Sequence, residues 1–275
     1  MNRNCLDSSF LLPPSSFRER IRVMMAKDRL NSEQSFHDRQ ARGRASSFAG
    51  AGALRFFDDC YLDHETWIRP ALARLGDVAG LPVLDYGCGH GMAAVVLARR
   101  GANVTAFDLS PGYLVEARRR ASANGVSIEL VQADAERLPF ADGRFARIWG
   151  NAILHHLDLR LAARELHRML QPGGIAVFCE PWGANPLLAW ARRRLPYPGK
   201  QRTPDEQPLL PHHVRLLREV FPSLQIEGHQ LLAMARRVLR PGRIMTGLEW
   251  CDGRLLSLAP SLARFCRYVV LTLRR

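Results

Sequence analysis

A glycine-rich turn carries the clearest chemical signal in this sequence. It follows a short apolar run, precedes the helix-forming run 92–98, and reads Asp85-Tyr86-Gly87-Cys88-Gly89-His90-Gly91. Glycines at alternate positions permit positive φ and let a ligand approach the backbone with no Cβ in the way. The helix start that follows presents free N–H groups and a partial positive charge. The turn therefore predicts a site for a nucleotide-like ligand, but a dinucleotide fingerprint would have its third glycine at Met92.

Three further polar residues follow apolar runs in the same way. Asp108 lies 19 residues after Gly89, close to the spacing at which an acid meets ribose hydroxyls in nucleotide-binding βαβ units. Asp134 and Asn151 come directly after the next two apolar runs. Because ligands of open α/β sheets bind at the carboxyl ends of the strands, we expect these side chains to surround one site.

The elements that must position these residues alternate along the chain. Strands are predicted at 83–86, 104–107, 128–133, 145–150 and 175–179, with helices between them. The strands are apolar on both faces, which is typical of a parallel sheet covered by helices. Right-handed crossovers then give an α/β fold with a doubly wound sheet.

The flanking segments are predicted to be mostly helical. Phe17–Leu30 has helical spacing and is either a lid over the site or a surface helix, and residues before it lack a regular pattern. One helical stretch, Phe48–Leu75, should lead directly into the first strand. Later in the chain we expect a helix at 216–221, two packed helices at 231–240 and 248–262, and two last strands at 223–230 and 265–273.

Residues 83–180, about a third of the chain, resemble the class I S-adenosylmethionine (SAM)-dependent methyltransferases, particularly their small-molecule branch. The resemblance rests on the glycine turn and on Asp108-Leu109-Ser110-Pro111, Ala133-Asp134-Ala135-Glu136-Arg137-Leu138-Pro139-Phe140, Leu154-His155-His156-Leu157 and Leu170-Gln171-Pro172-Gly173-Gly174. It implies a Rossmann-like, mostly parallel seven-stranded sheet whose last two strands are an antiparallel pair. One departure is Ala146, where the family usually has an acid.

The resemblance also implies SAM as the cofactor and assigns its contacts. Asp85 would hold the amino group, and Asp108 the ribose hydroxyls. Asp134 and the Ala135 N–H would meet the adenine, while Asn151 would face the methyl-donor pocket. The remaining cofactor-binding positions that it implies are Gly87, Gly89, Gly91 and Leu109.

The sequence assigns the residues that would contact the methyl acceptor less specifically than those that would contact the cofactor. His155 and His156 follow the fourth strand, where either could serve as a general base or simply begin the next helix. Glu180 could orient a substrate or cap the segment after it. By the resemblance, residues 181–215 form an insert that covers the substrate; its candidate contacts to a polar or anionic acceptor are Arg193, Tyr197 and Arg202. No residue spacing indicates a metal site.

Composition and charge narrow the function classes. The chain has 275 residues, 47% of them apolar, enough for one SAM-binding domain at 46–275 with an N-terminal extension at 1–45. No apolar run suits a transmembrane span, and six scattered cysteines fit a reducing cytoplasm. The net charge of +13 is concentrated after residue 180, where 16 Lys and Arg face six Asp and Glu.

We therefore expect methyl transfer to a small molecule, such as a bacterial secondary metabolite, a cofactor or a glycan. The basic flanks leave two alternatives: an RNA substrate, or a lipid or quinone acceptor with peripheral contact to a membrane surface. RNA is disfavoured, because the fourth strand is followed by Asn151-Ala152-Ile153-Leu154 and lacks the Asn-Pro-Pro-aromatic signature of base N-methylating enzymes. A SAM-fold binding or regulatory protein is the non-enzymatic alternative.

Overall fold

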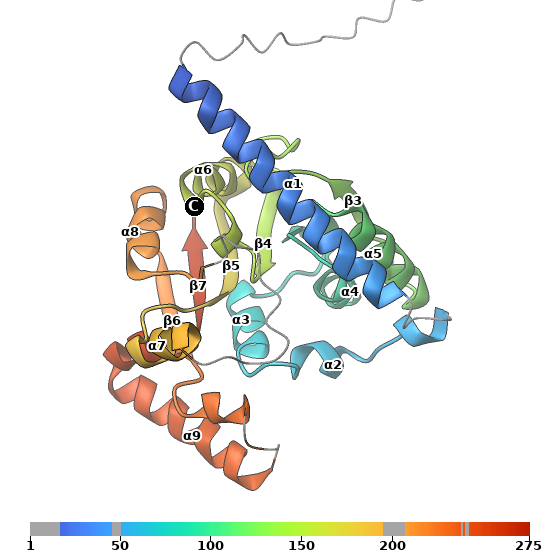
Figure 1. Ribbon diagram of the computed structural model, residues 1–275. Helices are drawn as coiled ribbons and strands as arrows, with labels where there is room; N and C mark the ends of the chain where they lie inside the picture. The colour runs from blue at the N-terminus through green and yellow to red at the C-terminus, as the bar shows by residue number, and fades with distance from the viewer. Residues whose placement is uncertain (1–16, 46–50, 195–206, 238, 240–241) are drawn as a thin grey trace, which may run out of the picture.

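The computed structural model describes residues 17–45, 51–194, 207–237, 239 and 242–275, with the side chains of 17–27, 51, 52, 192 and 193 left out (Figure 1). Tyr197 and Arg202, which were predicted to contact the acceptor, lie outside the described residues.

A seven-stranded sheet forms the centre of the molecule, with strand order β3-β2-β1-β4-β5-β7-β6. β1 to β5 pair in parallel, whereas β7 is antiparallel to both of its neighbours, β5 and β6. The strands are β1 Pro82–Tyr86, β2 Asn103–Asp108, β3 Glu129–Gln132, β4 Phe145–Asn151, β5 Leu170–Pro181, β6 Gln225–His229 and β7 Tyr268–Arg274. The predicted doubly wound sheet and its antiparallel last pair are confirmed.

Helices cover both faces of this sheet, because its strands are apolar on both sides. Alternate residues of β1 divide between two cores: Val83 packs with residues of α3 and α4, whereas Leu84 packs with residues of α6 and α8. These helices, with the neighbouring α5, are α3 Ile68–Leu75, α4 Met92–Arg99, α5 Pro111–Ala123, α6 Leu159–Met169 and α8 Pro211–Val220.

The N-terminal region departs from two predictions. Helix α1, Phe17–Ala45, continues well past Leu30 and lies beside α5 (Figure 1). The single helix predicted for Phe48–Leu75 is wrong: the described part of that stretch, from residue 51 on, forms η1 Ala51–Leu54, α2 Asp58–Leu62 and α3. The ring of Pro70 would clash with the carbonyl of residue 66 in a continuous helix, so α3 begins just before this proline.

The C-terminal region also differs from its predicted helices. In the segment 231–240 the described residues, 231–237 and 239, form one short 3-10 helix, η3 Ala233–Arg237. Helix α9 runs from Arg243 to Leu258, and η4 follows at Pro260–Phe265. Helix α9 ends where Pro260 prevents its continuation. Helix α7, Pro186–Arg194, lies in the predicted insert. Among the helices of the described ranges, none is long and apolar enough to cross a membrane.

Candidate functional site

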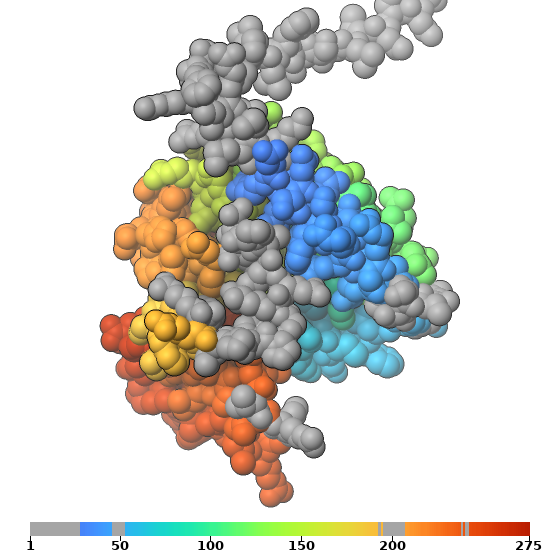
Figure 2. All heavy atoms as spheres, viewed as in Figure 1, coloured from blue at the N-terminus to red at the C-terminus, as the bar shows by residue number. Residues whose placement is uncertain are grey.

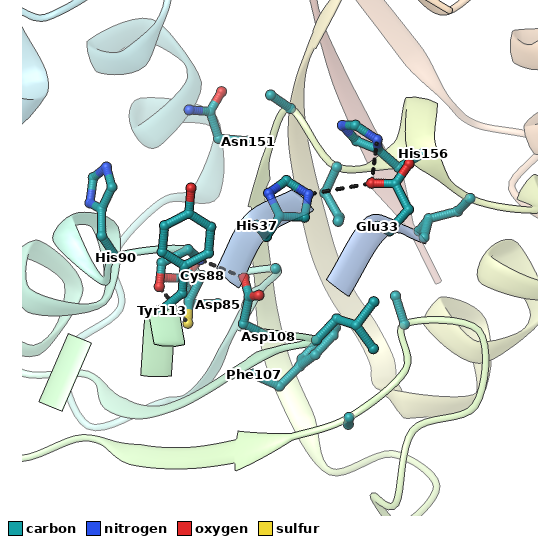
Figure 3. A pocket seen from close by; sticks show the side chains of 18 of the residues that line it. Glu33, His37, Asp85, Cys88, His90, Phe107, Asp108, Tyr113, Asn151 and His156 are labelled. Atoms are coloured by element: carbon teal, nitrogen blue, oxygen red, sulfur yellow. Dashed lines mark hydrogen bonds and ion pairs between the residues drawn. The ribbon is translucent and has the colours of Figure 1, made fainter. Parts of the chain in front are cut away.

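A cavity of about 380 Å³ lies at the carboxyl ends of β1, β2 and β4, with side chains of α1 forming one wall (Figure 3). Nine of the residues singled out from the sequence line it: Asp85, Gly87, Gly89, Asp108, Leu109, Asp134, Ala135, Asn151 and His156. The structure thus brings together the strand-end residues that lie far apart in the sequence.

The glycine turn forms one side of this cavity. Gly87 and Gly89 have φ of 71° and 49°, a region that L side chains rarely adopt. A Cβ on Gly87 would come within 2.8 Å of the Ile153 side chain, whereas a Cβ on Gly89 would meet no atom within 4 Å. Gly89 therefore presents bare backbone to open space. Gly91 does not line the cavity; its role is close packing, since a Cβ there would lie 2.7 Å from Ala117.

Asp85 is a buried carboxyl group with an unsatisfied hydrogen-bond acceptor among the described residues. It is 2% exposed, and its Oδ2 has no hydrogen-bond partner among the residues that the structure describes. Burial, together with the nearby Asp108, raises the pKa of Asp85 to about 7, although the Ala94 backbone N–H opposes that shift. A buried carboxylate without a partner is unfavourable, so this position suits a ligand that brings a positive charge or hydrogen-bond donors.

Asp108 and Asp134 are held in place by the backbone around them. The Gly89 N–H donates to Asp108 Oδ2 over 2.8 Å, and the Ser110 N–H donates to Oδ1 over 2.9 Å. Each Asp108 oxygen keeps a lone pair for a ligand hydroxyl. Burial raises the pKa of Asp108 from its ordinary value. Asp134 accepts from the Glu136 N–H over 2.9 Å, which fixes the turn after β3 at the cavity wall.

Helix α1 contributes cavity residues that were not predicted from the sequence, among them Arg29, Glu33 and His37. The helix is tied down beside the cavity: Asp38 accepts from the Ser110 hydroxyl, and Arg29 forms an ion pair with Glu136. Within the predicted segment 17–30, Arg29 and Leu30 line the cavity, and a lid role for the segment stays a prediction. The i, i+4 spacing of Glu33 and His37 was the available signal, but it is common on solvated helices.

A carboxylate between two histidines lies at one end of the cavity (Figure 3). Glu33 Oε2 is 3.4 Å from His37 Nε2 and 3.4 Å from His156 Nδ1. Burial alone would lower the pKa of His37, but hydrogen bonding to Glu33 and the charges of Asp108 and Glu33 raise it above its ordinary value. The raised pKa of His37 favours a proton on its imidazole, beside the Glu33 carboxylate.

His155 and Glu180 lie behind the cavity wall and do not line it. Glu180 is fully buried; its Oε1 accepts from the Ile153 and Leu154 N–H groups over 3.0 and 2.8 Å, and its Oε2 lies 2.7 Å from His155 Nδ1. These contacts fix the loop after β4, where Ala152 has a φ of 57°. Of the predicted insert, the described parts supply no cavity residue; Arg193 belongs to α7, and its side chain is not described.

Residues 83–174 match the family model described as "Methyltransferase domain". Over 108 residues the chain is 42% identical to a malonyl-[acyl-carrier protein] O-methyltransferase of Enterobacter lignolyticus, covering 39% of this chain and 41% of that protein. Over 142 residues it is 36% identical to a demethylmenaquinone methyltransferase of Thermus thermophilus, covering 48% and 64%. The chain thus spans less than two thirds of the length of either relative.

The fold is also similar to solved structures. An S-adenosylmethionine dependent methyltransferase from Mesorhizobium loti superposes with a TM-score of 0.51 at 22% identity, covering 78% of this chain and all of that chain. This likeness concerns the fold. The match to the family model, by contrast, includes every strand end that lines the cavity, since these lie within residues 83–174.

Proposed function

Because residues 83–174 form a class I SAM-dependent methyltransferase domain, we propose that this protein transfers the methyl group of SAM to a small-molecule acceptor. The observation that carries the proposal is Asp85. A buried carboxyl oxygen with no described partner, beside a glycine turn whose Gly89 faces open space, matches a ligand with an ammonium group next to an extended chain.

The residues of the cavity fit SAM. Asp85 would hold the amino group, Gly87 and Gly89 the methionine portion, and Asp108 the ribose hydroxyls. Asp134 and the Ala135 backbone would meet the adenine, with Leu109 and Asn151 completing the surroundings. The bound cofactor supplies an electrophilic methyl group on a sulfonium, and in-line displacement depends mainly on positioning of the acceptor.

His156 is the candidate general base, because it lines the cavity and His155 does not. An acceptor hydroxyl whose oxygen attacks the methyl group must lose its proton as the sulfonium–methyl bond breaks, and a neutral imidazole can receive that proton. Glu33, 3.4 Å from both His156 and His37, would then stabilise the imidazolium that forms. The competing role for the three residues is purely structural: they would only attach α1 to the loop after β4.

The acceptor that we propose is a small molecule with an acidic oxygen or an activated ring carbon. The relatives named as a malonyl-[acyl-carrier protein] O-methyltransferase and a demethylmenaquinone methyltransferase support this class. The cavity wall supports an apolar body for the acceptor, since Leu30, Ile153 and Leu157 contribute to it. An anionic acceptor and a cytoplasmic location remain part of the proposal, supported by the basic C-terminal third and by the free cysteines of the described residues.

Calorimetric titration with S-adenosylhomocysteine (SAH), the demethylated product, tests the cofactor half. We expect binding in the micromolar range or tighter; a folded sample that binds neither SAM nor SAH would refute the proposal. Release of SAH from SAM in the presence of malonyl thioesters, naphthoquinols and phenols then tests the acceptor half.

The role of His156 is tested by His156→Gln, with His212→Gln on the exposed start of α8 as the matched control. We expect His156→Gln to lower kcat and to leave SAH affinity and thermal stability unchanged. If the three residues only attach α1, the variant will lower thermal stability and leave kcat at the wild-type value.

A further inference from the structure

The C-terminal third of the chain has an unusual surface. Among the described residues, eleven large apolar side chains are exposed, and eight of them follow residue 180. Five of these eight are between 59% and 83% exposed: Leu187 and Trp190 on α7, and Ile244, Trp250 and Leu258 on α9. Scattered apolar residues need no explanation, but this concentration on two neighbouring segments indicates an interaction surface.

On α9 the exposed apolar residues and two arginines share one face. At 100° per residue, Ile244, Leu255, Leu258 and Trp250 fall within an arc of about 140°, together with Arg243 and Arg254. The buried residues of the helix, Met245 and Asp252, lie on the opposite side. Asp252 fixes this side by accepting the Leu231, Leu232 and Ala233 N–H groups. The orientation of α9 is therefore set by a buried contact, and its apolar and basic face points outward.

Positive charge accompanies these apolar residues. Residues 181–275 contain 16 Lys and Arg but only six Asp and Glu. Arg194, Arg243, Arg254 and Arg264 are exposed, and the Arg254 guanidinium lies 5.3 Å from the centre of the Trp250 ring. Exposed tryptophans beside arginines are the combination that membrane–water interfaces favour, because both side chains bury an apolar body and keep a polar end in water.

The shape of the surface around α7 and α9 suits a flat or deformable binding partner. Helix α9 packs mainly on η3 and η4 and projects below the sheet, where it forms a lower lobe (Figures 1 and 2). The start of α7 is joined to this lobe, since Asn185 Nδ2 donates to the Phe265 carbonyl over 2.6 Å. A protruding apolar face can insert between lipid headgroups without a complementary groove.

We propose that the outward face of α9, together with α7, binds the surface of an anionic lipid bilayer. The arginines supply attraction to the headgroups, and Ile244, Trp250 and Leu258 insert at the level of the headgroups and upper acyl chains. This goes beyond the proposed methyl transfer and does not depend on it, because the surface lies outside the cofactor cavity.

The test is sedimentation of the full chain with vesicles of phosphatidylcholine alone or mixed equally with phosphatidylglycerol. We expect binding to the anionic vesicles that weakens as salt is raised, and little binding to the neutral ones. Brominated lipids should quench tryptophan emission, since Trp190 and Trp250 are exposed while Trp67, Trp149 and Trp182 are buried. Absence of binding to anionic vesicles at low salt overturns the proposal.

Two double variants separate the electrostatic contribution to vesicle binding from the apolar one. Arg243→Glu/Arg254→Glu and Ile244→Asp/Leu258→Asp should each weaken binding by about tenfold or more. The matched controls are Arg119→Glu and Val115→Asp on the exposed face of α5, which should not change it. The last experiment measures binding of heparin, a soluble polyanion. If heparin binds as tightly as the vesicles and the Ile244→Asp/Leu258→Asp variant binds vesicles like wild type, the surface is a site for an acidic partner and the proposal is wrong. SAH affinity of each variant reports separately on the fold and the cofactor site.

Discussion

Replacing Asp85 by Asn should have opposite effects on the free protein and on ligand binding. Burial raises the pKa of this carboxyl from 3.8 to about 7, so the folded protein holds its proton over a range in which the unfolded chain has lost it. A carboxyl group whose pKa is higher in the folded state than in the unfolded state stabilises the folded state. This contribution is complete below the unfolded-state pKa and is lost as the pH rises through the folded-state pKa. The wild-type protein should therefore lose stability from about pH 4 to pH 7 on account of this group.

The size of the effect follows from the shift. Roughly three pKa units at 1.36 kcal/mol each correspond to about 4 kcal/mol, as an upper estimate for ionising Asp85 in the free protein. Asp85→Asn removes this contribution. The free energy of unfolding of the variant, measured by urea denaturation, should rise relative to wild type between pH 4 and pH 8 and level off above it.

Binding should show the reverse. The ligand ammonium stays charged up to pH 7, while the ionised fraction of Asp85 rises from about 1% at pH 5 to about half at pH 7, so SAH affinity should increase up to about fiftyfold. Asp85→Asn should flatten this dependence and weaken SAH binding at pH 7.5 by about tenfold to a hundredfold. A flat wild-type profile, or equal affinity in the variant, would show that Asp85 does not pair with the ligand.

Three further predictions concern the cavity walls and the loop behind them. Asp108→Ala should weaken SAH binding at least about tenfold by calorimetry, since it removes the acceptor assigned to the ribose; unchanged affinity would remove Asp108 from that role. Gly87→Ala should lower Tm much more than Gly125→Ala. Both positions have positive φ, 71° and 68°, but only at Gly87 would a Cβ meet the Ile153 side chain. Equal losses of Tm would mean that backbone strain alone matters. Glu180→Ala should cost about 3 kcal/mol of unfolding free energy, because it leaves two buried N–H groups unpaired; a change confined to the KM of the acceptor would instead favour substrate orientation.

The sheet and the gathering of the strand-end residues around one cavity could be predicted, because each signal was local. Asp85, Asp108, Asp134 and Asn151 all follow apolar runs, and parallel topology alone brings such strand ends together. The contribution of α1 could not be predicted in the same way. The apolar spacing of this helix fades after Leu30, because the residues that meet the cavity there are polar, and hydropathy does not distinguish a buried polar face from a solvated one.

Glu180 illustrates a second limit. Its place at the end of β5 was correctly predicted, but a strand-end residue can point into the cavity or back toward the neighbouring loop. Only the structure shows that the side chain turns to the Ile153 and Leu154 backbone. The pieces η1 and α2 were missed for a related reason: helical spacing persisted across Phe57, whose extended backbone separates them.

The position of β7 has a consequence for how the chain acquires its structure during synthesis. The five parallel strands can assemble once residue 181 has left the ribosome, because their order needs no later segment. β6 pairs only with β7, so it cannot join the sheet until residues 268–274 are available. Until then the exposed edge of β5, apolar on both faces, has no partner strand. The nascent chain is thus most exposed to aggregation after β1 to β5 have assembled and before β7 is available to cover the edge of β5.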